Sequence, residues 1–212
     1  PVTTLEVGSF SMLNHEVTFD LLLACIEAKM CPAQLKPGPN SGLQFRTPQQ
    51  TPMNRVSYHF IHNNFLPWLN GLSEHQFALP TEIQWEYAAK SGSITDYYWG
   101  DEVLANKMAC KGCEPLSSGR GPSLIKQFPA NQFGLFDMLG NVAELVEACW
   151  TDDHTLLKDN LHTAAKPNCR RRVIRGGAWS DAPYHSRTSS RKAVSSRSMS
   201  SAVGFRLILL AG

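Results

Sequence analysis

The stretch from Asn131 to Leu145, NQFGLFDMLGNVAEL, constrains the fold more than any other part of this sequence. It places Gly134, Gly140, two asparagines and two carboxylates among apolar residues, which is typical of neither a plain strand nor a plain helix. The glycines allow turns that direct carbonyl oxygens to one side, where Asp137 and Glu144 add charged oxygens. Carboxylate and carbonyl oxygens are the ligands of Ca²⁺, so the stretch indicates a calcium site. The alternative is that its polar residues only cap turns.

Four motifs together resemble a known family. The stretch itself is similar to N-x-[FY]-G-L-[FY]-D-M-x-G-N-V-x-E, a signature of the formylglycine-generating enzymes, also called sulfatase-modifying factors. The other three motifs follow in the family's order: LPTEIQWEYAA from Leu79, RVIRGGAW from Arg172 and GFRL from Gly204. The resemblance implies an α+β, C-type-lectin-like fold with little regular structure, in which peripheral helices surround a small antiparallel sheet. We expect residues 1–212 to form a single domain of this kind.

The composition agrees with a fold that is rich in turns. Charged residues make up 18% of the chain, with 15 glycines and 13 prolines. The net charge of +2 predicts no particular partner, and the basic residues are spread out except at 170–172, so we do not expect nucleic-acid binding. No apolar run approaches the roughly 20 residues of a membrane helix, so we expect no membrane insertion. Pro1 indicates a trimmed or mature chain, and members of the resembled family usually carry an export signal.

Six cysteines divide into pairs that are close in sequence or flank one loop. The pairs are Cys25 with Cys31, Cys110 with Cys113, and Cys149 with Cys169. In an exported protein this spacing predicts three disulfides, and with them a periplasmic location. The alternative for the Cys-Lys-Gly-Cys motif is a redox pair or half of a zinc site. A redox pair normally opens a helix, and the sequence has no second Cys-x-x-Cys to complete a zinc site.

Local patterns predict a few regular elements separated by long loops, which we place at Gln34–Asn54 and Asp101–Gln127. The expected strands are Val2–Phe10, Val173–Trp179 with a Gly-Gly bulge, and Gly204–Leu210. The expected helices, each with its N-cap, are Phe19–Lys29 after Thr18, Tyr58–Leu69 after Ser57, and Glu82–Lys90 after Thr81.

The resemblance assigns calcium ligands to individual residues. One family site uses two side chains and two carbonyl oxygens, which fall here on Asp137, Gly140, Val142 and Glu144. A second family site uses an Asn side chain, the next carbonyl and a later Asp. Asn106 and Lys107 match the first two ligands, but the Asp position falls near Ser117 or Ser118. Without that carboxylate we expect the second site to be weak or absent.

The family's catalytic residues are the main departure. Formylglycine-generating enzymes use two copper-binding cysteines between the RGGS[WY] and GFR motifs, where soft thiolates select Cu(I). No cysteine follows Cys169 in this chain, so we expect no formylglycine generation and assign no catalytic residue. Ala143 and Leu145 also stand where the family usually has tryptophans.

We therefore expect a non-catalytic binding or regulatory protein that acts through a protein partner. Family members of this kind include a periplasmic regulator that acts upstream of a membrane Thr kinase controlling type VI secretion. The alternative is a periplasmic oxidoreductase of siderophore maturation, of the type that matures pyoverdine. The candidate binding surface lies before the GFRL motif, a segment that is otherwise read as a solvated loop. Its residues are Ser180, Asp181, Tyr184, His185, Arg187 and Arg191.

Overall fold

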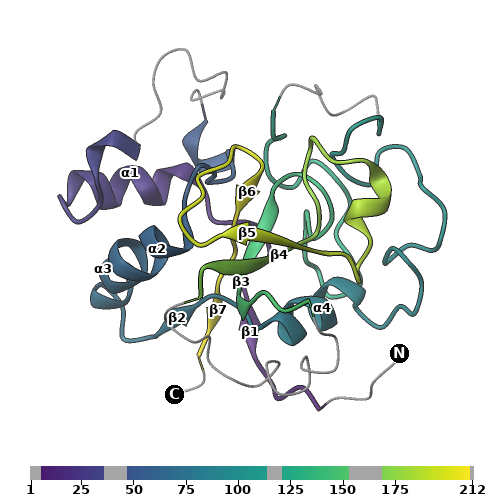
Figure 1. The fold of residues 1–212 in the computed structure, drawn as a ribbon, viewed down its shortest axis with the longest axis horizontal. Helices are drawn as coiled ribbons and strands as arrows, with labels where there is room; N and C mark the ends of the chain where they lie inside the picture. Colours follow the sequence, from purple (N-terminus) through teal and green to yellow (C-terminus); the bar gives the residue numbers. More distant parts are fainter. Residues whose placement is uncertain (1–5, 36–46, 114–120, 153–168, 211–212) are drawn as a thin grey trace.

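The computed structural model describes residues 6–35, 47–113, 121–152 and 169–210, and it contains two small sheets (Figure 1). The larger sheet has the strand order β5-β4-β3-β6 and the smaller has the order β1-β7-β2. The strands of the larger sheet are β3 (Ala143–Cys149), β4 (Arg171–Arg175), β5 (Arg191–Ser195) and β6 (Val203–Gly204). Those of the smaller sheet are β1 (Ser11–Met12), β2 (Phe77–Ala78) and β7 (Ile208–Leu209).

Helices lie at the periphery of both sheets. Helices α1, α2 and α3 lie together on one side, and α4 lies on the other side against β3 (Figure 1). Their bounds are α1 (Phe19–Glu27), α2 (Tyr58–Phe60), α3 (Leu66–Gly71) and α4 (Glu82–Lys90). A π-helical turn, Ile61–Phe65, joins α2 to α3. Short 3₁₀ turns occur at Ala33–Leu35, Pro48–Gln50 and Pro183–Ser186. This arrangement confirms the predicted α+β class with peripheral helices and much irregular chain.

The sheets are antiparallel except at one strand pair. Strand β4 pairs antiparallel with both β3 and β5, while β6 runs parallel to β3. In the smaller sheet both β1 and β2 pair antiparallel with β7. The segment Phe205–Leu207 carries the chain from β6 to β7, so one continuous run links the two sheets. The expected closing strand Gly204–Leu210 is therefore two short strands in different sheets.

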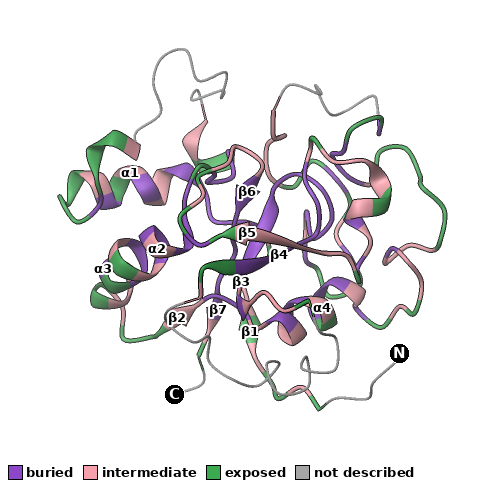
Figure 2. Cartoon of the chain, in the orientation of Figure 1, coloured by how far each residue is buried: buried purple, intermediate pink, exposed green. Residues whose placement is uncertain are grey.

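Strand β3 lies at the centre of the core because both of its faces are buried. Ala143 and Leu145 pack into a cluster with helices α1 to α3, whereas Val146 and Ala148 pack into a second cluster with Trp85 of α4. A register irregularity follows Leu145 in the pairing with β4. Figure 2 shows the same division, with buried strands in the middle and exposed outer faces on the helices. The central strand thus holds two apolar clusters together.

The predicted helix starts are confirmed, with one difference in chemistry. Thr81 and Gln84 form a reciprocal capping box at α4, and Ser57 Oγ accepts a hydrogen bond from the Phe60 N–H at 3.2 Å. Thr18 is the N-cap residue of α1, but its hydroxyl donates to the Asp20 carboxylate instead of accepting from the backbone. The predicted helix Tyr58–Leu69 is interrupted because its middle turn is π-helical.

Two strand predictions were displaced, and strands β2, β3 and β5 were not predicted from the sequence. Val2–Phe10 is not a strand at residues 6–10, residues 1–5 lie outside the described part, and the strand begins only at Ser11. The strand predicted at Val173–Trp179 ends at Arg175, because Gly176 and Gly177 take φ angles of 85° and 69° that stop the ladder. Strand β5 lies in a serine-rich segment whose side chains follow no apolar alternation.

The three predicted disulfides are confirmed. They join Cys25 to Cys31, Cys110 to Cys113 and Cys149 to Cys169, with Cα–Cα distances of 5.3, 5.2 and 5.7 Å. All six cysteines of the chain are therefore paired, and none is free. Such bonds persist in oxidising compartments outside the cytosol. Among the described residues no helix has the length and apolar character needed to cross a membrane.

We predict that Gly140→Ala destabilises the protein by roughly 3 kcal/mol, because a left-handed turn and a close backbone contact coincide there. Gly140 has a φ of 80°, and an added Cβ would lie 2.3 Å from the carbonyl oxygen of Ala109. Gly134→Ala is the matched control, since its φ is 76° with nothing within 4 Å, so only about 1 kcal/mol is expected. Urea unfolding of both variants measures the difference, and equal losses would contradict the steric argument.

Candidate functional site

A buried ion pair joins two of the family-like motifs, the stretch from Asn131 to Leu145 and the GFRL motif. Glu144 of β3 accepts hydrogen bonds from Arg206 Nη2 at 2.6 Å and Nε at 2.8 Å, and from Trp85 Nε1 at 2.7 Å. Both ion-pair side chains are at most 1% exposed. Arg206 also donates to the carbonyl oxygens of Leu13 and Phe136. The pair therefore joins β3, α4, the N-terminal strand region and the turn before residue 140.

The turn that carries Asp137 lies beside this ion pair, and three of its residues have left-handed backbone conformations. Asp137, Gly140 and Asn141 have φ angles of 54°, 80° and 57°. The Gly140 N–H donates to the Gly176 carbonyl at 2.8 Å, and the Asn141 N–H donates to the Ala109 carbonyl at 2.9 Å. These bonds hold the turn against two neighbouring segments. No backbone N–H among the described residues donates to the carbonyl oxygens of Gly140 or Val142.

Two further carboxylates beside the turn each have one oxygen without a hydrogen-bond donor. Asp137 Oδ2 accepts from the Lys126 N–H at 2.6 Å, and Glu16 Oε1 accepts from Asn141 Nδ2 at 2.9 Å. Asp137 Oδ1 and Glu16 Oε2 are buried and have no partner in the described part of the chain. A buried carboxylate oxygen without a hydrogen-bond donor is usually satisfied by a water molecule, a proton or a bound cation. No sequence motif singled out Glu16 as part of this centre, because the link to Asn141 exists only in the folded chain.

The charges of this centre do not balance. Among the described residues, the three buried carboxylates Glu16, Asp137 and Glu144 lie around one buried cation, Arg206. Burial, followed by the neighbouring Asp137, raises the pKa of Glu16 well above its usual range. Burial likewise raises the pKa of Asp137 to about 6, although the Lys126 hydrogen bond and Arg206 act in the opposite direction. An added positive charge would relieve this repulsion.

The predicted calcium ligands lie together around this centre. Asp137, Gly140, Val142 and Glu144 occupy one turn and the start of β3, but the Glu144 carboxylate is already engaged by Arg206. No group of three or more His, Cys, Asp or Glu side chains in the described ranges is arranged as a metal site. A cation here would therefore rely on carbonyl oxygens and on the unpartnered Asp137 oxygen, which is the kind of ligand set that Ca²⁺ accepts.

The second predicted calcium position is more open. Asn106 is exposed and has a φ of 62°, and Lys107 follows it in a loop before the Cys110–Cys113 disulfide. The expected third ligand falls at Ser117 or Ser118, which lie outside the described residues. The structure thus places only two members of this site.

The predicted binding surface is a charged, well-anchored segment. Asp181 pairs with Lys192 at 2.6 Å and accepts from the Ala178 N–H at 3.1 Å. Tyr184 is 58% exposed, and its ring lies 3.9 Å from that of His185. Ser180 is also exposed. A shallow surface depression lies beside this segment. Its lining residues are Ala143, Ile174, Gly177, His185, Ser190, Arg191 and Lys192.

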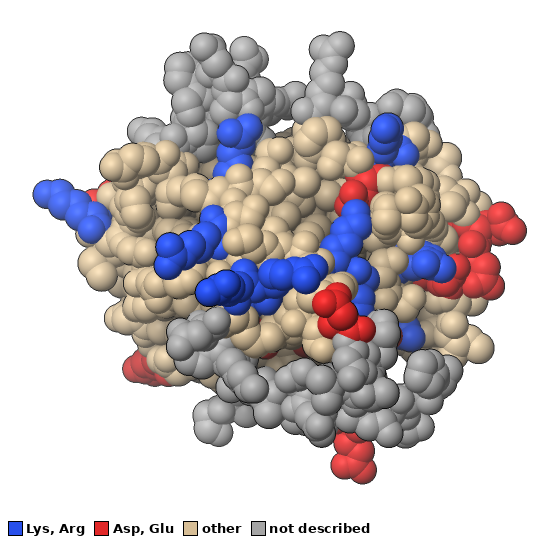
Figure 3. All heavy atoms as spheres, in the orientation of Figure 1, with Lys and Arg blue, Asp and Glu red and all other residues tan. Residues whose placement is uncertain are grey.

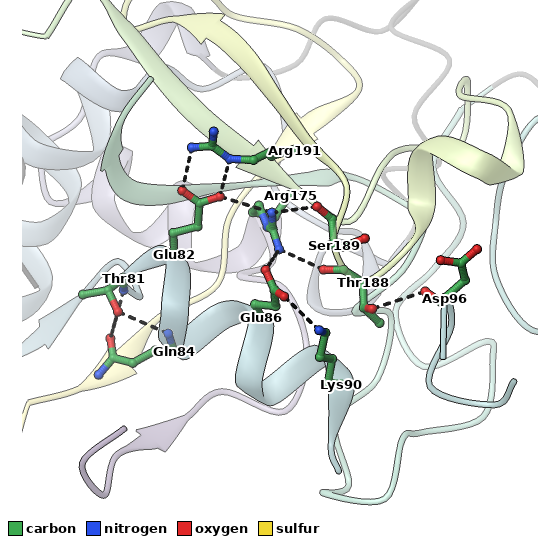
Figure 4. A network of polar contacts seen from close by, with 10 residues as sticks. All are labelled: Thr81, Glu82, Gln84, Glu86, Lys90, Asp96, Arg175, Thr188, Ser189 and Arg191. Atoms are coloured by element: carbon green, nitrogen blue, oxygen red, sulfur yellow. Dashed lines mark hydrogen bonds and ion pairs between the residues drawn. The ribbon is translucent and has the colours of Figure 1, made fainter. Parts of the chain in front are cut away.

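Buried arginines fix that surface to helix α4 (Figure 4). Arg175 donates to Glu82 Oε1 at 3.1 Å and to Glu86 Oε2 at 2.6 Å, and it also reaches the Thr188 carbonyl. Arg191 binds the same Glu82 through two hydrogen bonds, at 2.7 and 2.9 Å. The Arg191 side chain is only 11% exposed, so it positions the surface more than it presents a charge.

One other polar cluster emerges only from the fold. Tyr58 O–H donates to Glu147 Oε1 at 2.5 Å, and His62 Nε2 lies 2.8 Å from Glu147 Oε2. The Arg172 guanidinium stacks 3.6 Å from the centre of the Tyr58 ring. Burial and the Glu147 hydrogen bond raise the pKa of Tyr58 above its usual value. Glu147 lies far from both helical residues in sequence, so no local pattern indicated this contact.

Comparison with known proteins identifies the family. The family model of the sulfatase-modifying factor enzyme 1-like domain matches residues 1–211. The chain belongs to this family. It is 32% identical over 152 residues to the formylglycine-generating enzyme of Mycobacterium tuberculosis (strain ATCC 25618 / H37Rv), covering 61% of this chain and 50% of that protein. It is 32% identical over 147 residues to the inactive C-alpha-formylglycine-generating enzyme 2 of Bos taurus, covering 63% and 44%.

The share of each relative that is covered and the sequence identity determine what these matches show. The chain spans about half the length of the curated relatives it matches. The solved structure of PvdO from Pseudomonas aeruginosa superposes with a TM-score of 0.79 at 24% identity, covering 95% of this chain and 80% of that one. At this identity the likeness shows the fold alone, and it confirms the fold that the motifs of this sulfatase-modifying factor family member predict.

We predict that Asp137 gives the stability of this protein a measurable pH dependence in buffer without divalent cations. Its folded-state pKa is raised from 3.8 to about 6, so its contribution is complete below the unfolded value and is lost as pH rises through 6. Relative to wild type, Asp137→Asn should gain on the order of 3 kcal/mol between pH 4 and pH 7. Thermal unfolding with EDTA measures this difference, and a difference that does not change with pH would contradict the assignment.

Proposed function

We propose that this chain is a non-catalytic binding protein built on the sulfatase-modifying factor fold. The observation that carries the proposal is that all six cysteines are consumed in disulfides. Copper-dependent formylglycine formation in the resembled enzymes needs a thiolate pair, and this chain has no thiol to supply one. The inactive C-alpha-formylglycine-generating enzyme 2 of Bos taurus is, by its name, a relative without the activity.

The segment between the RGGAW and GFRL motifs supports a role in recognition. It is held by ion pairs from Asp181 to Lys192 and from Arg191 to Glu82, so its backbone is fixed while Tyr184 remains exposed. Fixed polar segments with an exposed aromatic side chain are typical of recognition surfaces, because little conformational entropy is lost on binding. We propose that this surface contacts a protein partner.

The disulfides support an exported protein, and we propose the periplasm as its compartment. A membrane signalling or secretion component is the partner class that follows from the resemblance to the regulator of type VI secretion.

We further propose that Ca²⁺ stabilises the turn around Asp137. The support is the charge imbalance of three carboxylates against Arg206, together with the unpartnered Asp137 oxygen and the Gly140 and Val142 carbonyls. Glu144 would contribute through its charge while remaining bound to Arg206. A second ion at Asn106 and Lys107 would bind more weakly, since neither residue adds a negative charge.

The non-catalytic proposal predicts no conversion of a cysteine-containing sulfatase peptide. The purified chain, loaded with Cu(I) and supplied with oxygen, should leave the peptide cysteine unchanged by mass spectrometry, because it has no thiolate pair to hold the metal. The formylglycine-generating enzyme of Mycobacterium tuberculosis serves as the positive control. Formation of formylglycine by this chain would overturn the proposal.

Crosslinked capture in the native host tests the binding part of the same proposal. A single membrane component should be recovered with wild type and lost with Tyr184→Ser. Leu72→Ser is the matched control, because Leu72 is 70% exposed at the end of α3 and lies outside the surface. Recovery of no protein, together with a co-purifying redox metal or chromophore, would contradict the binding role.

The calcium proposal predicts that millimolar Ca²⁺ raises the melting temperature at pH 7.5 and that Asp137→Asn removes this effect. At a concentration 100 times the dissociation constant the stabilisation is about 2.7 kcal/mol. Calorimetric titration should show one strong binding event in wild type. Asn106→Ala is the control that should leave this event intact. If Asp137→Asn binds Ca²⁺ as tightly as wild type, the site lies elsewhere.

A further inference from the structure

Strand β5 leaves one edge of the larger sheet open. Within the part of the chain that the structure describes, it is the outermost strand and pairs only with β4. The Ser196 N–H donates to the directly opposite Arg170 carbonyl at 2.9 Å. In an antiparallel ladder, hydrogen-bonded pairs alternate with pairs that exchange no hydrogen bond. This bond therefore fixes which residues of β5 face β4 and which face outward.

Arg191 and Ala193 are outward-facing residues by this register. Each turns one N–H and one C=O group away from β4, and no backbone hydrogen bond to these groups is found in the described ranges. At the far end of the strand the outward-facing Ser195 carbonyl already accepts from the Ser198 N–H at 2.9 Å, and beyond it the His59 N–H donates to the Ser196 carbonyl at 3.2 Å. Unpaired edge groups of this kind are a template for an added strand.

The side chains around this edge are basic. Arg170, Arg171 and Arg197 are exposed, and Lys192 lies between the two outward-facing residues. Figure 3 shows Lys and Arg atoms in a band across this face, where Figure 1 places β4 and β5. Arg171 pairs with Asp152 and Lys192 pairs with Asp181, whereas among the described residues Arg170 and Arg197 take part in no ion pair. The edge therefore presents free backbone groups next to uncompensated positive charge.

The positive charge beside the β5 edge indicates which kind of partner strand can bind there. A second copy of this chain would place like charges opposite one another, which is how native proteins prevent edge-to-edge association. An acidic segment would instead place carboxylates beside the arginines. A surface depression at the start of β5 is lined in part by His185 and Lys192. Geometry and charge thus favour the same ligand.

We propose that β5 binds an acidic, extended segment of a partner protein as an additional strand of the sheet. The added strand exchanges hydrogen bonds with Arg191 and Ala193, and its carboxylates face the basic side chains on either side. This inference rests on the proposed binding function and names the chemistry of the partner. It adds main-chain recognition to the side-chain surface described above.

A pair of peptides of equal charge tests the strand pairing. The probe is a fluorescein-labelled Thr-Asp-Val-Glu-Val-Asp-Thr peptide, and the matched control carries N-methyl groups on both valines, which removes two backbone donors. The control should bind about tenfold to thirtyfold more weakly by fluorescence anisotropy. Hydrogen exchange should show new protection at the Arg191 and Ala193 amides with the probe only. Equal binding of both peptides would overturn strand addition and leave only an attraction of charges.

Two variants of the protein complete the test. Ala193→Pro removes an outward N–H without removing a bond to β4, a position where an edge strand accepts proline, so the protein should fold and lose the peptide. Near-ultraviolet circular dichroism checks its fold. Arg170→Glu combined with Arg197→Glu keeps the backbone edge intact and should weaken binding through charge. Probe binding unaffected by both variants, or no binding to wild type, would overturn the inference, whereas the calcium and sulfatase-peptide results do not depend on β5.

Discussion

The ion pair between Glu144 and Arg206 is the contact on which the rest of this structure depends. Glu144 lies on the central strand, and Arg206 lies in the segment that passes from one sheet to the other. Trp85 brings helix α4 to the same carboxylate. Because both charges are almost fully buried, removal of either one would leave an uncompensated charge in the core, which costs several kcal/mol. One buried pair therefore fixes the relation of a helix, two sheets and a long turn.

The same centre explains why irregular backbone dominates this part of the molecule. Left-handed residues at Asp137, Gly140 and Asn141 fold the chain tightly around the pair and bring Glu16 alongside. The result is a concentration of buried carboxylates that one arginine does not neutralise. Burial, together with this excess of negative charge, raises the pKa values of Glu16 and Asp137. A carbonyl-rich turn with excess negative charge links the fold directly to the proposed cation.

The proposed binding surface is organised differently, by ion pairs that fix a segment at the outside of the sheet. Arg175 and Arg191 share Glu82, and so connect β4 and β5 to helix α4. This connection holds the segment in place without cysteine chemistry. The family fold is thus retained while its surface is available for the proposed recognition role, and the edge strand β5 lies beside that surface.

Sequence alone determined the family, the class of fold, three helix starts and the disulfide pairs, because these depend on local motifs, caps and short spacings. Thr81 with Gln84, for instance, encodes a helix start within four residues. Only the tertiary structure decided that Glu144 binds Arg206, that Glu16 joins Asp137, and that the serine-rich segment contains an edge strand. These outcomes pair residues far apart in the chain, and β5 is stabilised by hydrogen bonds to β4 and not by an apolar pattern of its own.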